Sequence, residues 1–400
     1  MPRVCLNALG DYGDSVSREN LANLYFRLQR RFENGTGVTA AETLAAREVY
    51  HCRGEPEGSR TAAKERSMIS VIATVLNEGE SMHSLLRSLQ RQTLAPDEVV
   101  IVDGGSRDDT VAIIRGYEDR LPLRLLIEAG CNISQGRNRA IEAARGDIIA
   151  VTDAGVRLSD DWLARITERL RLDPALNAVG GFFAADARTP FELALGATTL
   201  PLAREIAAET FLPSSRSIAF RKAAALRVGL YPEWLDYCED LVFDLRLRGA
   251  AGPFAFEPRA LAHFRPRATL RQYFRQYYFY ARGDGKANLW FKRHLVRYAV
   301  YLLLAPLILA AGVLIHPLMW GLYIIGGGVY LFQPYRRLPA LLRGIGERSR
   351  LIWLYCLVAI PWLRFVGDAA KMLGYPAGLR WRLRQQPPDW RWRDEARGED

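Results

Sequence analysis

The pattern of apolar and polar residues divides the 400-residue chain into three parts. Residues 1–67 are polar and contain the glycine-bearing stretches ENGTG and RGEPEGSR. Residues 68–287 alternate short apolar runs with amphipathic stretches, and residues 288–400 hold long apolar runs between basic residues. We therefore predict an N-terminal extension that is poorly ordered or partly helical, a globular domain, and a membrane region with a basic tail.

Residues 68–155 repeat one unit, in which an apolar run of strand length precedes an amphipathic stretch of helix length. The run ISVIATVLNE is followed by MHSLLRSLQRQ, EVVIVDGGS by TVAIIRGYEDR, and LRLLIEAG by SQGRNRAIEAARG, before GDIIAVTDAG begins a fourth unit. Such alternation implies right-handed crossovers and a mostly parallel sheet. The predicted fold class is therefore α/β. In the first part of the chain, VTAAETLAAREVY has the pattern of a single helix.

Two apolar runs, about 298–315 and 318–332, lie in a stretch that has no Asp, Glu, Lys or Arg. As helices each would be roughly 22–27 Å long at about 1.5 Å per residue, short but sufficient to span a bilayer. Basic residues flank the pair but not the turn between its members, so the positive-inside rule puts the globular domain in the cytoplasm. We predict a multi-pass protein of the inner membrane; two buried core helices are the alternative.

A third segment, about 351–366, has a shorter apolar run, residues 351–363, which contains Pro361. If it crossed the membrane, the arginine-rich tail would lie outside the cytoplasm, against the positive-inside rule. We expect an interfacial segment there, with a third span as the alternative.

The charge balance and the cysteines narrow the class of protein. The chain has 54 Lys and Arg against 44 Asp and Glu, a net charge of +10. Because basic residues flank the apolar runs, this charge fits an anionic membrane surface better than nucleic acid. The five cysteines are scattered without CxxC spacing, which argues against a disulfide framework or a zinc site and fits a reduced, cytoplasmic setting.

Polar side chains follow each of the four predicted strands. Asn77-Glu78, Asp103, Glu128 and Asp153 stand at the carboxyl ends of the apolar runs. In an open parallel sheet these ends meet at one edge, where ligands bind. Turns also favour Asp and Asn, so ordinary loops are the alternative. The stretch DGGSRDDT adds a glycine turn and capping residues, which suit a phosphate at a helix N-terminus or an ordinary turn alike.

Two later stretches carry further candidate chemistry. Glu239-Asp240 begins a segment that fits a helix, and the pair is either a cap that complements the helix dipole or a general base. The stretch RQYFRQYYFYARGDGKA interleaves aromatic residues with arginines. It fits an interfacial helix, or a wall of the site where arginine meets a diphosphate. We expect its glycine-rich end, residues 282–287, to be a flexible lid that closes over a ligand.

Five stretches in this order resemble glycosyltransferase family 2, whose members have the GT-A fold: ISVIATVLNE, DEVVIVDGGSRDDT, ISQGRNRAIEAARGDIIAVTDAG, CEDLVFDLRLRGAAG and RQYFRQYYFYARGDG. The resemblance covers residues 68–287. It implies a Rossmann-like catalytic domain followed by membrane helices. It also implies inverting transfer from a nucleotide-diphosphate sugar to a lipid-linked or saccharide acceptor, as in making cell envelope polysaccharide. No nucleic acid beyond the donor's nucleotide is implied.

The resemblance also assigns roles to single residues. Asp240, paired with Glu239, matches the catalytic base. Gln272 and Arg275 fit part of a QxxRW motif in which Gln276 replaces the tryptophan. We therefore expect Gln272 and Gln276 on the acceptor side, and addition of a single sugar. The residues matched to the donor pocket are Leu76, Asn77, Glu78, Asp103, Arg137, Asp153 and Arg275.

The metal site is the main departure from the family pattern. Asp153 matches the first aspartate of the DxD motif, but Gly155 stands where the second is expected. Mg²⁺ held by Asp153, the diphosphate and water is one arrangement. Mn²⁺ with His263 as a further ligand is another, although His263 fits an ordinary packing role equally well. In the third, Arg265, Arg267 and Arg275 neutralise the leaving group with less help from a metal.

Two other functions remain open from the sequence. A non-catalytic membrane subunit or sensor that binds a nucleotide sugar is favoured by Gly155, whereas Asp153 and Asp240 argue against it. A nucleotidyltransferase usually carries a glycine-rich, basic signature after the first strand, where this chain has TVLNEGES.

Overall fold

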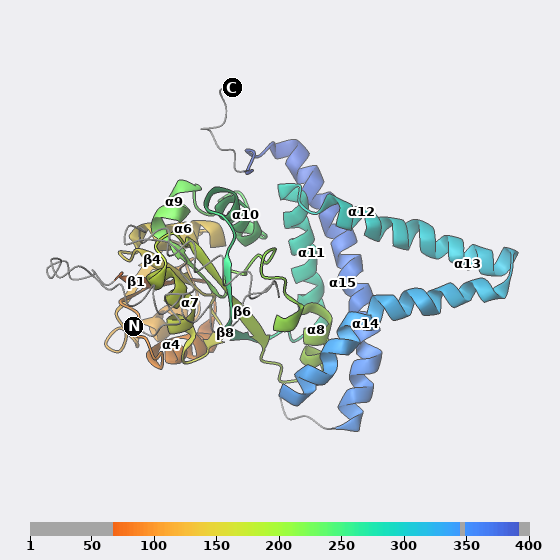
Figure 1. Ribbon diagram of the computed structural model, residues 1–400, viewed down its shortest axis with the longest axis horizontal. Helices are drawn as coiled ribbons and strands as arrows, with labels where there is room; N and C mark the ends of the chain where they lie inside the picture. Colours follow the sequence, from red (N-terminus) through yellow and green to blue (C-terminus); the bar gives the residue numbers. More distant parts are fainter. Residues whose placement is uncertain (1–66, 345–348, 392–400) are drawn as a thin grey trace, which may run out of the picture. The chain divides into compact units, whose positions relative to one another are not determined.

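The computed structural model describes residues 67–344 and 349–391 (Figure 1). The helix predicted in VTAAETLAAREVY and the end of the basic tail lie outside these residues. Within them, eight strands form one sheet in the order β3-β2-β1-β4-β7-β6-β8-β5. The predicted α/β class is confirmed, and the sheet is mixed rather than wholly parallel.

The first half of the sheet is parallel, as the sequence pattern predicts. Strand β1 pairs in parallel with β2 and β4, and β2 pairs in parallel with β3. The register places Val75 opposite Asp103, so the polar ends of β1 and β2 come together. The strand bounds are Ile69–Val75 for β1, Glu98–Asp103 for β2, Leu123–Ile127 for β3 and Ile148–Val151 for β4.

Helices cover both faces of these strands, because alternate strand residues point to opposite faces. Val71 of β1 belongs to the core that α4 covers with Leu85, whereas Ile72 belongs to the core that α6 covers with Ile141. Helix α5 ends at Arg115, before the predicted stretch is complete. The helix bounds are Met82–Gln90 for α4, Thr110–Arg115 for α5 and Ile133–Ala143 for α6, and a 3₁₀ turn spans Gly79–Ser81.

The second half of the sheet reverses direction. Strand β7 is antiparallel to β4 and β6, β6 is parallel to β8, and β5 is antiparallel to β8. The strand bounds are Val156–Leu158 for β5, Ala178–Ala185 for β6, Ile218–Arg221 for β7 and Ala255–Phe264 for β8. The helices between them are α7 (Trp162–Leu172), α8 (Pro190–Thr199), α9 (Lys222–Arg227) and α10 (Glu239–Ala251), and a 3₁₀ turn spans Ala203–Glu205.

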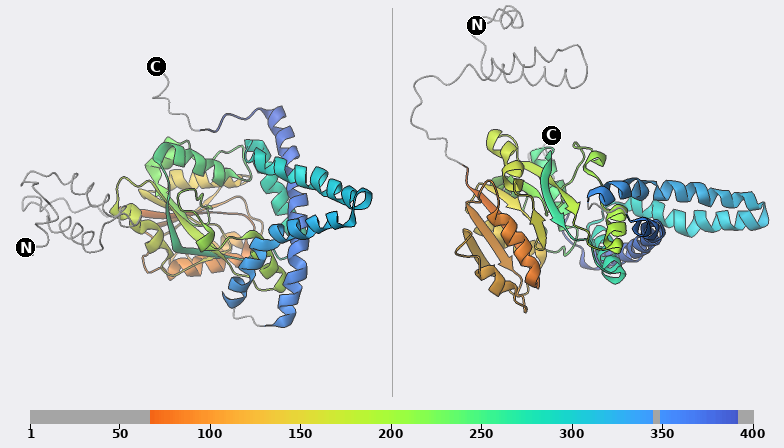
Figure 2. Two further views of the ribbon diagram at one scale, coloured as in Figure 1. Left: turned by 45° about the vertical axis from the view of Figure 1, so that its right-hand side comes forward. Right: turned by 90° about the horizontal axis from the view of Figure 1, so that it is seen from below.

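A set of long helices follows the sheet. In Figures 1 and 2, α11 lies beside α15, and α13 runs antiparallel to α14 as a hairpin. The hydroxyl groups of Tyr301 and Tyr330 lie 3.0 Å apart across the base of that hairpin. The bounds are Leu270–Ala287 for α11, Phe291–Ala299 for α12, Val300–Leu304 for a π-helical turn, Ala305–Leu314 for α13, Pro317–Trp320 for a 3₁₀ turn, Gly321–Gly344 for α14 and Arg350–Gln385 for α15.

The predicted lid at residues 282–287 is wrong. This stretch is the last part of α11, and its glycines lie against backbone rather than in open space. A Cβ atom on Gly283 would meet the carbonyl oxygen of Tyr237, and one on Gly285 would meet backbone of α15 at Gly378. The glycines therefore serve close packing between α11 and its neighbours, not hinge motion.

Two helices of the described residues are long and apolar enough to cross a membrane, judged by length and composition. They are Phe291–Leu314, with mean hydropathy 1.9 and 6% of its apolar window buried, and Arg350–Gln385, with mean hydropathy 1.5 and 33% buried. The first contains most of the predicted span 298–315, and the second contains the run expected to be interfacial. The predicted span 318–332 falls in the 3₁₀ turn and the start of α14.

Candidate active site

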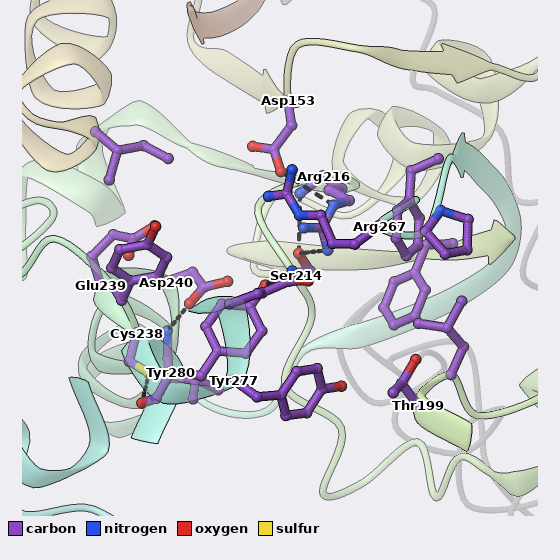
Figure 3. A pocket seen from close by; sticks show the side chains of 18 of the residues that line it. Asp153, Thr199, Ser214, Arg216, Cys238, Glu239, Asp240, Arg267, Tyr277 and Tyr280 are labelled. Carbon is purple, nitrogen blue, oxygen red and sulfur yellow. Dashed lines mark hydrogen bonds and ion pairs between the residues drawn. The ribbon is translucent and has the colours of Figure 1, made fainter. Parts of the chain in front are cut away.

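A cavity of about 1090 Å³ opens beside the carboxyl ends of β1 and β4 (Figure 3). Its walls come from the loop after β4 with Asp153, the loop before β7 with Arg216, the start of α10 with Asp240, and one face of α11. The cavity continues between α12 and α15, where Lys371 lines it. The sheet edge predicted from the polar strand ends is thus one wall of a larger enclosure.

Arg137 of α6 ties two acidic side chains together inside this wall. It is 3% exposed, and it donates from Nη2 to Asp153 Oδ1 at 2.8 Å and from Nη1 to Glu239 Oε1 at 2.6 Å. Burial alone lowers the pKa of Arg137, but the carboxylates of Asp153 and Glu239 outweigh that effect and raise it above its ordinary value. The guanidinium therefore stays charged and fixes the start of α10 against the end of β4.

Arg216 approaches Asp153 from the other side. Its Nε lies 3.3 Å from Asp153 Oδ2, and its Nη1 donates to Ser214 Oγ at 3.3 Å. The guanidinium also lies over the ring of Phe264, 4.6 Å from the ring centre. Both carboxylate oxygens of Asp153 thus have an arginine partner. Arg216 is not among the residues predicted from the sequence, since LPSSRSIAF carries no motif; its place two residues before an apolar run was the one available signal.

The acidic pair at the start of α10 lies in the same cavity, with Asp240 facing Tyr280 in Figure 3. Cys238 precedes the pair with φ 64°, a left-handed conformation that non-glycine residues seldom adopt. Burial, and then the neighbouring Asp240 carboxylate, raise the pKa of Glu239 to about 7. Burial also raises the pKa of Asp240, partly opposed by Arg137.

Asp240 differs from the other acids of the cluster in its partners. Its Oδ1 accepts a hydrogen bond from the backbone N–H of Leu241 at 2.9 Å. Among residues 67–344 and 349–391 no basic side chain forms an ion pair with it, whereas Asp153 and Glu239 are both held by Arg137. An unpaired carboxylate with a raised pKa, in an open cavity, suits proton transfer.

Helix α11 supplies the opposite wall. Gln272 and Gln276 both line the cavity, and Gln276 Nε2 donates to the hydroxyl of Tyr280 at 2.7 Å. Arg275, which the sequence assigned to the donor, is not among the described residues that line the cavity; its guanidinium lies over the ring of Phe279 at 5.5 Å. The lining face of α11 runs through Gln276, Tyr280 and Asp284, and Gln272 stands at its edge; the helical period places Arg275 beyond that edge.

The donor residues predicted at the first two strand ends divide into two groups. Glu78 lines the cavity together with Arg137 and Asp153. Asp103, fully buried, accepts hydrogen bonds from the backbone N–H groups of Gly105 and Ser106 and holds the turn after β2.

The remaining predicted donor residues, Leu76 and Asn77, lie in the turn after β1. Asn77 adopts φ 53° and accepts a hydrogen bond from the backbone N–H of Arg107, whereas the Leu76 side chain is half exposed. These turns therefore border the cavity beside Glu78 rather than line it.

The fit of a metal rests on the surroundings of Gly155. A Cβ atom added there would lie 3.3 Å from Glu78 Oε2, so a carboxylate already occupies the space of the missing second aspartate. Among the described residues no three His, Cys, Asp or Glu side chains gather closely enough to hold a metal alone. Asp153 and Glu78, completed by phosphate oxygens and water, suit a hard cation such as Mg²⁺. Binding of the cation would require Asp153 to release one of its two arginine partners.

His263 does not join this group. It stands in β8 opposite Arg157 of β5, and its Nε2 lies 3.2 Å from Ser159 Oγ, outside the residues that line the cavity. Burial lowers its pKa. The proposed Mn²⁺ ligand is therefore corrected to a packing role, because the antiparallel pairing of β5 and β8, which the sequence did not predict, fixes it at the sheet edge.

Comparison with known families matches residues 70–231 to the family described as Glycosyl transferase family 2. These residues include Arg137, Asp153 and Arg216 and end before Glu239 and Asp240. Over residues 70–231 the chain matches the family that the sequence motifs indicate.

Curated relatives share only part of their length with this chain. An uncharacterized glycosyltransferase of Escherichia coli K12, YibD, is 38% identical over 87 residues, 22% of this chain and 25% of that protein. The validoxylamine A glucosyltransferase of Streptomyces hygroscopicus subsp. limoneus is 30% identical over 128 residues, 31% of this chain and 28% of that protein. The chain thus spans under a third of the length of these two relatives.

A solved structure supports the fold over nearly the whole chain. The mannosyltransferase PcManGT from Pyrobaculum calidifontis, in complex with GDP-Man and Mn²⁺, matches with a TM-score of 0.54 and 18% identity, and the match covers 90% of this chain and 96% of that chain. At this identity the likeness shows the fold alone, and it confirms the GT-A architecture.

Proposed function

We propose that this chain, a member of glycosyltransferase family 2 through residues 70–231, transfers a sugar from a nucleotide-diphosphate sugar to a lipid-linked or saccharide acceptor, with inversion at the anomeric carbon. One observation carries the proposal. A single cavity holds the unpaired carboxylate of Asp240 and, on another wall, Asp153 with its two arginines. A proton acceptor and a diphosphate-binding group are what such a transfer requires.

The donor's diphosphate binds at the carboxyl ends of β1 and β4, next to Arg216 and Arg267. Both arginines line the cavity there, and guanidinium groups donate to phosphate oxygens in a fixed fork. Their charge stabilises the negative charge that develops on the leaving nucleoside diphosphate. When bound, Mg²⁺ or Mn²⁺ would add positive charge at the same place, and Asp153 and Glu78 are the residues that would hold it.

Asp240 acts as the general base. It accepts the proton of an acceptor hydroxyl as that oxygen forms its bond to the anomeric carbon, while the bond to the diphosphate breaks on the opposite face. Attack opposite the leaving group inverts the configuration. Burial raises the pKa of Asp240 toward the range where a carboxylate is an effective proton acceptor near neutral pH. Gln272 and Gln276 lie on the acceptor side.

The setting we propose is the cytoplasmic face of the inner membrane, in the making of cell envelope polysaccharide. Large apolar side chains of α13 and α14 are exposed, among them Leu307 at 65% and Ile324 at 80%. Such a surface is expected of lipid-facing helices rather than of a soluble protein. The basic residues that flank these helices favour the cytoplasmic side for the catalytic domain.

A non-catalytic subunit that binds a nucleotide sugar is the second candidate, favoured by Gly155. The test is a thermal-shift screen of the detergent-solubilised chain with UDP-, GDP- and TDP-sugars, with and without Mg²⁺ or Mn²⁺. A ligand at a hundred times its dissociation constant adds about 2.7 kcal/mol of stability. The proposal expects a shift with one donor, and release of its nucleoside diphosphate on incubation. A shift without any release favours the subunit, and no shift with any donor contradicts both.

A further inference from the structure

The cavity has a second end, which α11, α12 and α15 line. Arg293, His294, Arg297 and Lys371 are among the residues there. None of them takes part in the transfer chemistry proposed above. Three of them come from Phe291–Leu314 and Lys371 comes from Arg350–Gln385, the two helices of the described residues that are apolar and long enough to cross a membrane.

Positive charge exceeds negative charge at this end. Asp368 is the central carboxylate: Arg297 Nε donates to its Oδ1 at 2.9 Å, and Lys371 Nζ lies 3.5 Å from the same oxygen. The hydroxyl of Tyr330 donates to Asp368 Oδ2 at 2.6 Å, and Arg364 lies over the Tyr330 ring at 4.5 Å. Two cations thus share one carboxylate, and a third, Arg364, lies on the far side of the Tyr330 ring.

Two of these cations keep hydrogen-bond donors unused. The Lys371 ammonium has three N–H donors, and within residues 67–344 and 349–391 its one acceptor is Asp368. Arg364 Nε is buried and has no hydrogen-bond partner in that part of the chain. Asp284, the other nearby carboxylate, is already paired with His294 Nε2 at 3.1 Å. Unmatched charge away from water is costly, and a bound anion would remove the cost.

This cationic end lies close to the base. Lys371 Nζ is 4.9 Å from the centre of the Tyr277 ring, and the rings of Tyr277 and Tyr280 are 5.6 Å apart. Tyr280 in turn faces Asp240 in Figure 3. Lys371 and Asp240 therefore line the same cavity with Tyr277 and Tyr280 between them, so an acceptor held at Lys371 lies in the cavity that holds the base.

We propose that the cationic end formed by Arg297 and Lys371, which both line the cavity, binds the phosphate group through which a saccharide acceptor is linked to a long-chain lipid. The inference rests on the proposed transferase function and deepens it by naming the group of the acceptor that is recognised. Lysine and arginine are the usual protein partners of phosphate. A soluble sugar phosphate offers the same chemistry, but the position between two candidate membrane helices favours the lipid.

The test uses the full chain in detergent and three probes: farnesyl phosphate, farnesol and inorganic phosphate. We expect farnesyl phosphate to bind at least about tenfold more tightly than farnesol, the order of one charge-assisted contact, and more tightly than inorganic phosphate. Equal binding of farnesyl phosphate and farnesol would overturn the phosphate site. Equal binding of farnesyl phosphate and inorganic phosphate would overturn the lipid as its source.

Substitutions of Lys371 test whether farnesyl phosphate binds at this residue. Lys371→Met should weaken farnesyl phosphate binding about tenfold, and Lys371→Arg should keep it. Lys292→Met is the matched control, because Lys292 lies on α12, is exposed and does not line the cavity. Equal losses in Lys371→Met and Lys292→Met would contradict the site. The nucleotide-sugar shift separates the two proposals: if it persists while farnesyl phosphate fails to bind, this inference alone is wrong, and if it is absent, the transferase function is wrong.

Discussion

The two ends of the cavity differ in which charged group is left without a full set of partners. At the strand ends, Arg137 and Arg216 hold Asp153 and Glu239, and among the described residues the carboxylate of Asp240 has no ion-pair partner. Between the helices, Arg297 and Lys371 share the single carboxylate of Asp368. A surplus acid in a buried place has a raised pKa and accepts protons, whereas a surplus cation there calls for an anion. Both ends contain ion pairs, so the charge of the unpaired group distinguishes proton acceptance at one end from anion binding at the other.

The largest expected effect is on catalysis, from Asp240→Asn. Asparagine keeps the shape but accepts no proton, and loss of a general base typically slows transfer about 10²–10⁴-fold. Released nucleoside diphosphate in the presence of acceptor measures the rate, and the thermal shift with donor measures binding. Binding should remain. Lost donor affinity with normal turnover would remove Asp240 from the role of base.

The largest expected effect on stability comes from Arg137→Met. This change leaves the buried carboxylate of Glu239 without its partner, while Asp153 keeps Arg216, and breaking such a buried pair costs about 3–5 kcal/mol. Arg139→Met is the matched control, two residues along the same helix, where the side chain is 59% exposed and pairs with Glu142; it should cost under about 1 kcal/mol. Similar melting temperatures for the two variants would mean that Arg137 does not hold α10 in place.

A smaller effect is expected from Arg216→Ala on donor binding. Loss of a charge-assisted contact to phosphate costs about 1.5–3 kcal/mol, or roughly 10–150-fold in affinity. Donor affinity is measured by titration of the thermal shift. Arg165→Ala, a change on the surface of α7, is the control and should leave affinity unchanged. If Arg216→Ala binds donor normally, Arg216 serves only to position Asp153.

The smallest effect is a shift in pH dependence. The acid limb of the kcat/KM profile reports the Glu239–Asp240 pair, because the base must be deprotonated. Glu239→Gln removes a neighbouring negative charge, which lowers the pKa of Asp240, so the acid limb should move to lower pH. An unchanged or upward-shifted limb would show that the two carboxyl groups do not interact.

The raised pKa of Glu239 also predicts how the stability of the folded chain changes with pH. The pKa of Glu239 is raised from 4.5 to about 7 in the folded chain. Between these values the folded state binds more protons than the unfolded state, so stability should fall as pH rises from about 4.5 to about 7. Glu239→Gln should flatten that part of the melting-temperature profile, and a profile as steep as that of the unchanged chain would contradict the raised pKa.

The sequence predicts the first half of the sheet well, because it depends on local patterns. Strands β1 to β4 and helices α4 and α6 follow from apolar periodicity and short connections. The antiparallel insertion of β7 between β4 and β6 pairs distant segments, and no local pattern encodes it. For the same reason Arg216, two residues before β7, and Lys371, near the middle of α15, could not be assigned to the cavity from sequence.

The glycines of residues 282–287 and His263 show that residue type alone does not predict a residue's role. The glycines of residues 282–287 indicate flexibility in a sequence, but in the structure Gly283 and Gly285 permit close contact with backbone. His263 has the chemistry of a metal ligand, yet strand pairing puts it beside Ser159. Glu78, in contrast, does lie at the site to which the sequence assigns it. The fold adds that its carboxylate lies beside Gly155, which the sequence does not predict.

The most direct test of two separate anion sites measures two ligands with two variants. The affinities for the nucleotide sugar and for farnesyl phosphate are determined for both Arg216→Ala and Lys371→Met. The account predicts that Arg216→Ala weakens the nucleotide sugar and leaves farnesyl phosphate unchanged, and that Lys371→Met does the reverse. Loss of both ligands in either variant, with the fold intact, would contradict two separate anion sites at the two ends.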